Sequence, residues 1–313
     1  MRGAAVLGLG AHRPALRQDN LAIAERTGSS DEWIRARSGI ATRGVAGADE
    51  SVVDMAVSAG GKALAAAGLT GADVGLVLLA TCSMPGPLPG GSPEVASRLG
   101  ATAAGASDIG AGCAGFTYAL ALAADAVRAG SADAVLVVGS EKLLPMVDPD
   151  DRGTAFLFGD GAGAAVVGVS DVDTIGRVVW ANDGDQADRL VIEGSPLRLR
   201  MDGRGIYRWA TTSLPDLARR ACAAAGIEPA DLAAFVPHQA NLRITESVVK
   251  SLGLPASVVV ARDVVDSGNT SAASVPLALT RLQEEGAVRT GDPVLLLGFG
   301  AGLTAAGCVV HCP

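Results

Sequence analysis

The chain has 313 residues, of which 49% are apolar, 3% are aromatic and 41 are glycine. This length and apolar content can fill a sizeable core, and the composition is typical of a tightly packed α/β protein rather than a disordered chain. The formal charge of −8 argues against general nucleic-acid binding, because neutralising phosphates needs a basic face.

The sequence predicts a cytoplasmic protein without a membrane segment. No run reaches the roughly 18 apolar residues that a spanning helix needs, and the amino end lacks the layout of a signal peptide. The cysteines are odd in number and lack paired metal-ligand spacing, which argues against a disulfide framework or a metal site. We expect five single thiols: Cys82, Cys113, Cys222, Cys308 and Cys312.

Short β-branched runs alternate with alanine-rich segments of helical length, which predicts α/β units with largely buried parallel strands. The predicted strands are 74–80, 134–139, 162–167, 234–236 and 294–298. The predicted helices are 52–67, 115–129, 214–225, 242–251 and 272–285.

The two halves of the chain echo each other. Each closes on a glycine-rich turn followed by an apolar strand, FGDGAGAAVVG at 158–168 and GFGAGLTAAGCVV at 298–310. This predicts a duplicated α/β core whose halves are residues 1–170 and 171–313. No composition shift marks a flexible linker between them, so we expect the halves to share one core.

Cys113 follows a glycine-rich approach and precedes a strong helix-forming run, which places its thiol at or near a helix amino terminus. The helix dipole and free N–H groups there are expected to favour the thiolate and lower the pKa of the thiol. The same N–H groups could bind a thioester oxyanion. The alternative is a buried structural thiol, the commoner state of a cysteine with apolar neighbours.

His238 lies between a predicted strand and a predicted helix, in the type of loop that often carries catalytic residues. His12 and His311 lie near the chain ends, so His238 is the leading candidate for imidazole chemistry. The alternative is a histidine satisfied within a turn. Asn269, just before the predicted helix 272–285, reads by itself as a turn or N-cap residue.

Six segments, in order along almost the whole chain, resemble β-ketoacyl-ACP synthase III, the initiating ketosynthase of fatty-acid synthesis. They are SSDEWIRARSGI (29–40), CAGFTYAL (113–120), DRGTAFLFGDGAGAAV (151–166), PHQANLRI (237–244), GNTSAAS (268–274) and GFGAGLT (298–304). The resemblance implies an α/β, thiolase-like duplicated αβαβα layered fold, usually a homodimer. It also implies a catalytic set of Cys113, His238 and Asn269.

The implied reaction has two steps. Acyl-CoA acylates Cys113, and a decarboxylative Claisen condensation with malonyl-ACP then gives β-ketoacyl-ACP, CoA and CO2. Sulfur suits both steps, being a good nucleophile and a good leaving group. His238 and Asn269 would donate hydrogen bonds to the enolate, and a second oxyanion hole would use the backbone N–H groups of Cys113 and Ala301. Acyl-CoA and malonyl-ACP are substrates, and no cofactor or metal is implied.

Substrate contacts follow from the same resemblance. The implied CoA contacts are Trp33, Arg37, Arg152, Leu157, Gly203 and Asn241, with Trp33 and Arg152 sandwiching the adenine. Arg243, Lys250 and Arg208 would bind the acyl carrier protein, because an acidic enzyme needs a local positive patch to meet an acidic carrier. Leu88 falls where the family caps the acyl pocket across the dimer interface, and its flanking prolines predict a pocket unlike the strict acetyl form.

Several alternatives stay open at this stage. A pathway-specific relative could make starter units for polyketide or secondary metabolism, or could transfer an acyl group without condensation. A biosynthetic thiolase is less favoured, since Cys308 and Cys312 lie in an apolar closing strand. A nucleotide-binding loop at VLGLGAH (6–12) is a weak match, because no helix follows promptly. The stretch between Trp180 and Met201 is short for the family, which predicts a wider tunnel mouth.

Overall fold

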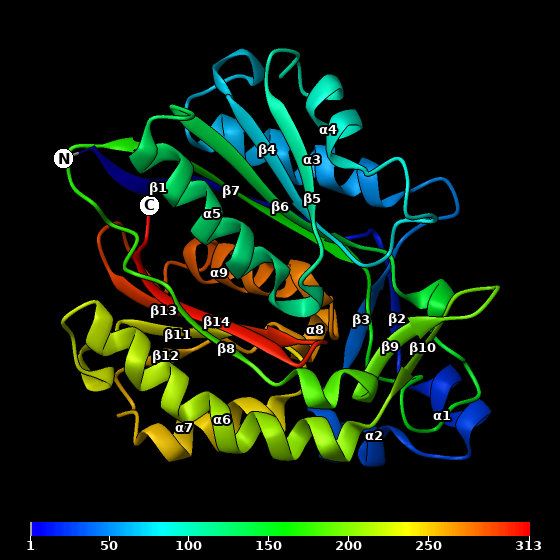
Figure 1. Ribbon diagram of the computed structural model, residues 1–313. Helices are drawn as coiled ribbons and strands as arrows, with labels where there is room; N and C mark the ends of the chain where they lie inside the picture. Colours follow the sequence, from blue (N-terminus) through cyan, green and yellow to red (C-terminus); the bar gives the residue numbers. More distant parts are fainter. Residues whose placement is uncertain (1) are drawn as a thin grey trace.

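The computed structural model describes residues 2–313 and contains two five-stranded sheets with helices on both sides of each (Figure 1). The first sheet has the order β1-β7-β6-β4-β5 and the second has the order β8-β14-β13-β11-β12. The strands of the first sheet are β1 (Gly3–His12), β4 (Leu76–Ala80), β5 (Gly105–Ile109), β6 (Ala134–Glu141) and β7 (Gly161–Ser170). Those of the second are β8 (Val179–Asn182), β11 (Ala234–Pro237), β12 (Val259–Val260), β13 (Pro293–Gly300) and β14 (Thr304–His311).

The second sheet repeats the pairing pattern of the first. Strand β4 runs parallel to β5 and β6, whereas β7 is antiparallel to both β6 and β1. In the second sheet β11 runs parallel to β12 and β13, and β14 is antiparallel to β13 and β8. The repeat that the sequence suggested is therefore present. The division at residue 170 stays a prediction, since one hydrophobic cluster joins residues from both halves.

The helices complete five layers, as the predicted αβαβα fold requires (Figure 1). Helices α3 (Val52–Ala66) and α4 (Ser92–Arg98) cover the outer face of the first sheet, and α6 (Gly203–Ala224) and α7 (Leu242–Leu252) cover the outer face of the second. Helices α5 (Gly115–Ala129) and α9 (Ser274–Glu284) lie between the sheets. Outside these layers lie α1 (Leu21–Thr27), α2 (Asp31–Ser38), α8 (Val264–Ser267) and the strand pairs β2 (Leu16–Asp19) with β3 (Thr42–Val45) and β9 (Leu190–Glu193) with β10 (Arg198–Met201).

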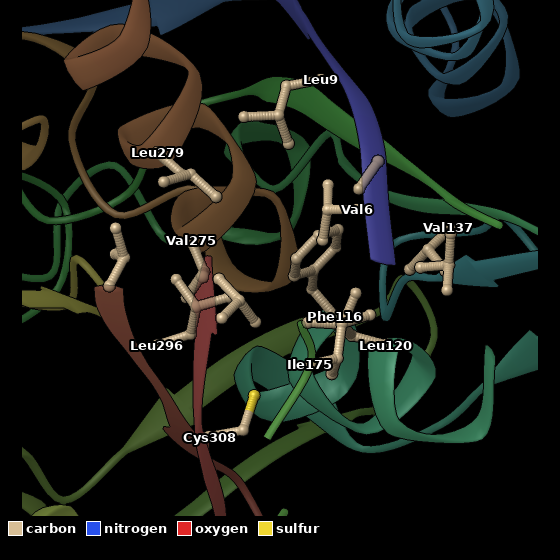
Figure 2. Close-up of a cluster of buried hydrophobic side chains, with 14 of the residues drawn as sticks. Val6, Leu9, Phe116, Leu120, Val137, Ile175, Val275, Leu279, Leu296 and Cys308 are labelled. Atoms are coloured by element: carbon tan, nitrogen blue, oxygen red, sulfur yellow. The ribbon is translucent and has the colours of Figure 1, made fainter. Parts of the chain in front are cut away.

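The two central helices are fixed by the core between the sheets. Figure 2 shows Phe116 and Leu120 of α5 in one cluster with Val275 and Leu279 of α9 and Leu296 of β13. All five side chains are at most 1% exposed. Burial of each contributes about 1.5–3 kcal/mol, so the amino ends of α5 and α9 are anchored by a rigid core.

One sequence interpretation needs correction. Helix α6 begins at Gly203 and not at residue 214, because the Asp202 side chain caps it by accepting the Gly205 N–H. Its first turns bury Ile206 and Trp209, and the helix continues through Pro215. The nucleotide-binding loop at VLGLGAH, a weak match in the sequence, is excluded, because the segment lies within strand β1 and pairs with β7. Within residues 2–313, no helix has the length and apolarity to cross a membrane.

Candidate active site

Cys113 lies on the short helix η2 (Gly112–Ala114), between the end of β5 and the start of α5. Its neighbour across the site is the end of β13. A Cβ atom added at Gly300 would lie 2.8 Å from the Cβ of Cys113 and 2.9 Å from its backbone nitrogen. Only glycine permits this approach, which brings the following turn, with Ala301, against the backbone of Cys113.

Burial controls the protonation of this thiol. Cys113 is 7% exposed, and desolvation raises the pKa of its thiol to about 12, although a hydrogen bond with the Ser271 hydroxyl opposes the rise. The expected lowering of the pKa by the helix terminus is therefore wrong. Removal of water from the thiolate favours the protonated form, so Cys113 rests as a neutral thiol.

His238 follows β11, and its backbone N–H donates to the carbonyl of Leu297 at 2.7 Å. The ring packs edge-on against Phe299, with 5.0 Å between ring centroids. Its Nδ1 lies 2.6 Å from the hydroxyl of Ser274. Burial lowers the pKa of His238 to about 3, so the imidazole is neutral throughout the physiological pH range.

Asn269 is held by its backbone and by one side of its amide. Its N–H donates to the carbonyl of Leu157 at 2.8 Å, and its carbonyl accepts the N–H of Gly159 at 3.0 Å. The side-chain Oδ1 accepts the N–H of Ser271 at 2.9 Å. This contact leaves the Nδ2 hydrogens of Asn269 available as donors, and Asn269 lines a large cavity.

The three residues are gathered around one segment, residues 269–274. Asn269 begins it, and Ser271 on η6 (Ser271–Ala273) lines the same inner cavity as Cys113. Ser274, at its end, contacts the ring of His238. Helix η2 packs against both η6 and β13. The thiol and the carboxamide thus each line one of two cavities beside this segment, and the imidazole, which lines neither cavity, contacts the end of the same segment.

An outer cavity of about 950 Å³ leads to Asn269. All six residues expected to contact CoA line it: Trp33, Arg37, Arg152, Leu157, Gly203 and Asn241. The guanidinium groups of Arg37 and Arg152 each lie 4.8 Å from the centroid of the Trp33 ring. An adenine stacked between Trp33 and Arg152 needs about 3.5 Å on each side, so Arg152 must move outward to form the expected sandwich.

The residues of the expected carrier-protein patch are divided. Arg208 and Arg243 line the outer cavity, and Arg243 also lies over the ring of Tyr207, 5.4 Å from its centroid. Lys250 is exposed in the last turn of α7, the helix that carries Arg243, and does not line this cavity.

An inner cavity of about 320 Å³ contains Cys113, Ala301 and Ser271. Its walls are mainly apolar and include Leu143, Phe158, Leu190, Val191, Ile192 and Leu199. The last four come from the β9–β10 hairpin, within the stretch that the sequence indicated to be short. Leu88, the expected cap, is 87% exposed in the single chain and does not line this cavity.

Sequence reasoning missed Glu141, which is fully buried beside the site. Its carboxylate accepts the hydroxyls of Thr81 at 3.1 Å and Ser83 at 2.5 Å, and the N–H of Cys82 at 3.1 Å. These bonds fix the loop after β4, whose residues Thr81 and Cys82 line the inner cavity. The available signal was an acidic residue directly after the apolar run AVLVVGS, where a buried charge needs partners.

All five cysteines are free thiols. Within the described part of the chain, residues 2–313, no group of three or more His, Cys, Asp or Glu side chains is arranged to hold a metal ion.

Comparison with known proteins agrees with this geometry. The family model for 3-oxoacyl-[acyl-carrier-protein (ACP)] synthase III matches residues 107–184, and the model for its C-terminal part matches residues 222–312. The β-ketoacyl-[acyl-carrier-protein] synthase III 4 of Streptomyces coelicolor is 51% identical over 315 residues, which cover 100% of this chain and 99% of that protein. The β-ketoacyl-[acyl-carrier-protein] synthase III of Mycobacteroides abscessus is 46% identical over 321 residues, which cover 98% of this chain and 94% of that protein.

Solved structures give the same result. The priming β-ketosynthase from the R1128 polyketide biosynthetic pathway superposes with a TM-score of 0.97 and 45% identity, covering 100% of this chain and 97% of that one. The 3-oxoacyl-(acyl carrier protein) synthase III of Pseudomonas aeruginosa gives a TM-score of 0.94 and 39% identity, covering 100% and 99%. This chain belongs to the β-ketoacyl-[acyl-carrier-protein] synthase III family of condensing enzymes.

Proposed function

We propose that this protein transfers an acyl group from acyl-CoA to Cys113 and then condenses it with the malonyl group of malonyl-ACP. The observation that carries the proposal is the position of Cys113, His238 and Asn269 around residues 269–274. Neighbouring residues line the two cavities there: Leu157 and Asn269 line the outer cavity, and Phe158 and Ser271 line the inner one. The outer, arginine-lined cavity suits the phosphate groups of CoA, and the inner, apolar cavity suits an acyl chain.

In the first step, the sulfur of Cys113 attacks the thioester carbonyl. A new C–S bond forms to the enzyme, the C–S bond to CoA breaks, and the thiol proton of Cys113 leaves with CoA. The backbone N–H groups of Cys113 and Ala301 hold the tetrahedral oxyanion. Because Cys113 is neutral at rest, with a pKa of about 12, its proton must depart as the sulfur attacks.

In the second step, malonyl-ACP loses CO2 and leaves an enolate on its thioester oxygen. The Nδ2 hydrogens of Asn269 and the ring N–H of His238 donate to that oxygen. The enolate carbon attacks the acyl-Cys113 carbonyl, the C–S bond to Cys113 breaks, and the sulfur takes up a proton from solvent, so the condensation consumes one proton. The products are β-ketoacyl-ACP and CO2. Acyl-CoA and malonyl-ACP enter as substrates, and we assign no cofactor.

Trp33 and Arg152 would sandwich the adenine of CoA, and Arg37 would pair with its phosphates. Arg208, Arg243 and Lys250 would meet the acidic carrier protein. A cytoplasmic location fits the five free thiols.

A homodimer is part of the proposal, since β5 lies at the edge of the first sheet and Leu88 is largely exposed. In such a dimer, Leu88 of one protomer would be covered by its partner and would cap the partner's acyl pocket. The mass of the protein in solution, measured by light scattering, should be twice that of one chain.

A second candidate is a priming ketosynthase dedicated to one secondary-metabolite pathway. The similarity to the R1128 priming β-ketosynthase favours it, with a TM-score of 0.97. The two candidates share the chemistry and differ in the acyl-CoA and the carrier protein that they accept.

The test is to incubate the purified protein with a panel of acyl-CoAs, record its intact mass, and then add malonyl-ACP. We expect one acyl adduct, absent from Cys113→Ala, and a β-ketoacyl-ACP product. His238→Ala and Asn269→Ala should still acylate but should release about 10²- to 10³-fold less CO2. Acylation without any condensed product would instead indicate a plain acyltransferase.

A further inference from the structure

Ser274 is the first residue of α9, is fully buried, and does not face either substrate cavity. Within residues 2–313 its hydroxyl has two hydrogen-bond partners. It accepts the backbone N–H of Gln239 at 3.2 Å, and it lies 2.6 Å from Nδ1 of His238. The direction of the second hydrogen bond decides which ring nitrogen of His238 carries the proton.

The direction follows from counting donors and acceptors. The Gln239 N–H can only donate, so the Ser274 oxygen accepts there, and its own hydrogen needs an acceptor. In this buried place the available acceptor is Nδ1 of His238. If Nδ1 carried the proton instead, the Ser274 hydrogen would be buried without a partner, which is costly.

We propose that Ser274 is a positioning residue that fixes His238 in the tautomer with the proton on Nε2. The inference rests on the proposed use of His238 as a donor in the condensation. Nδ1 is occupied by Ser274, so Nε2–H is the ring group left to donate a hydrogen bond to a substrate. With Oδ1 of Asn269 held by the Ser271 N–H, both residues present N–H groups, as an oxyanion requires.

The position of Ser274 adds a second effect. The amino end of α9 carries the positive end of the helix dipole, which disfavours a charged imidazolium beside it. Burial acts in the same direction, lowering the pKa of His238 to about 3. The ring therefore stays neutral and can donate only through the nitrogen that bears its single proton.

Nitrogen NMR of protein labelled with ¹⁵N-histidine reads the tautomer directly. The chain has three histidines, and His238→Gln assigns the signal. At neutral pH we expect a protonated Nε2 and an unprotonated Nδ1 in the wild type, and a signal from protonated Nδ1 to appear in Ser274→Ala. Protonated Nδ1 in the wild type, or an unchanged tautomer in Ser274→Ala, would overturn the proposal. This measurement does not depend on condensation activity.

Partial reactions test the consequence. Ser274→Ala should slow CO2 release from malonyl-ACP about tenfold, the effect of losing one buried hydrogen bond, and should slow acylation of Cys113 much less. Ser274→Thr keeps the hydroxyl and should recover most of the rate. Thr280→Val is the matched control, since it removes a buried hydroxyl of α9 that bonds Pro276 and not His238. Equal losses in both steps for Ser274→Ala would indicate a merely structural role. Absence of CO2 release in the wild type would instead contradict the proposed function.

Discussion

At the scale of single residues, burial sets the chemistry of the site. Cys113 and His238 are both neutral at rest, because desolvation raises the pKa of the thiol to about 12 and lowers that of the imidazole to about 3. A neutral imidazole suits a hydrogen-bond donor, whereas a general base would need a pKa near the working pH. The low pKa of His238 therefore favours its use as a hydrogen-bond donor to the enolate over its use as a base that abstracts a proton.

The neutral state of His238 has a consequence for stability. Its pKa is about 3 in the folded protein against 6.5 for an ordinary histidine, so between these values the unfolded chain binds a proton that the folded protein does not. The stability that the neutral, buried His238 contributes to the folded protein is fully present above pH 6.5 and is lost as the pH falls toward 3. Relative to His238→Gln, the free energy of unfolding of the wild type should fall by about 1.4 kcal/mol per pH unit in this window. Urea unfolding at several pH values measures it, and a constant difference would contradict the burial argument.

Gly300 is a second residue whose substitution has a defined outcome. An added Cβ would meet the Cβ and backbone nitrogen of Cys113 at 2.8 and 2.9 Å, so Gly300→Ala must displace the nucleophile or the turn at Ala301. We expect acylation to fall about 100-fold, since misplacement by about 1 Å has that effect. Gly184→Ala is the control: like Gly300, Gly184 does not have a left-handed φ, but a Cβ added there would meet nothing within 4 Å. Normal acylation by Gly300→Ala would show that the site can relax around the contact.

At the scale of elements, the β9–β10 hairpin shapes the acyl cavity. The residues of β10 alternate: Leu199, which pairs with Ile192, lines the cavity, whereas Arg200 bonds Glu193 at 2.9 Å in solvent. Leu199 is 8% exposed. The hairpin therefore forms an apolar wall of the cavity. Because it is a separate two-stranded sheet, its side chains can be substituted without changing the two large sheets.

Shortening this wall should change the preferred acyl chain. Leu199→Ala enlarges the inner cavity and should raise kcat/KM for longer acyl-CoAs relative to shorter ones about tenfold, the typical worth of a methylene in an apolar pocket. Arg200→Ala, on the same strand with its side chain in solvent, is the control. Competition between acyl-CoAs of different length measures the ratio, and an unchanged ratio in Leu199→Ala would exclude the hairpin from primer selection.

The elements also show what the sequence could and could not predict. Helix α5 was predicted with its observed bounds, because residues 115–129 form an unbroken helix-forming run that ends at Gly130 in a left-handed conformation. The hairpin was missed because LVIE and RLRM are too short to indicate strands, and only pairing across the turn stabilises them. The pKa of Cys113 was mispredicted for a related reason: burial depends on distant segments, including Gly300 and Ser271, that local sequence does not reveal.

At the scale of the whole molecule, duplication explains why the site lies where it does. The carboxyl ends of the central strands in both sheets lead to the site, with Thr81 after β4 and His238 after β11. The turns before α5 and α9 also match, since Gly112 and Ser271 begin η2 and η6 with φ of 50° and 48°. Serine is strained there. One copy of the motif supplies the thiol, and the other supplies the groups that surround it.

The central claim is that the acyl group on Cys113 becomes part of the condensed product. The most direct measurement mixes isolated acyl-enzyme with malonyl-ACP and follows a single turnover by rapid quench. We predict that acyl-Cys113 disappears at the rate at which β-ketoacyl-ACP and CO2 appear, one for one. Loss of the acyl group as free acid, or its transfer to another acceptor without CO2, would contradict the account.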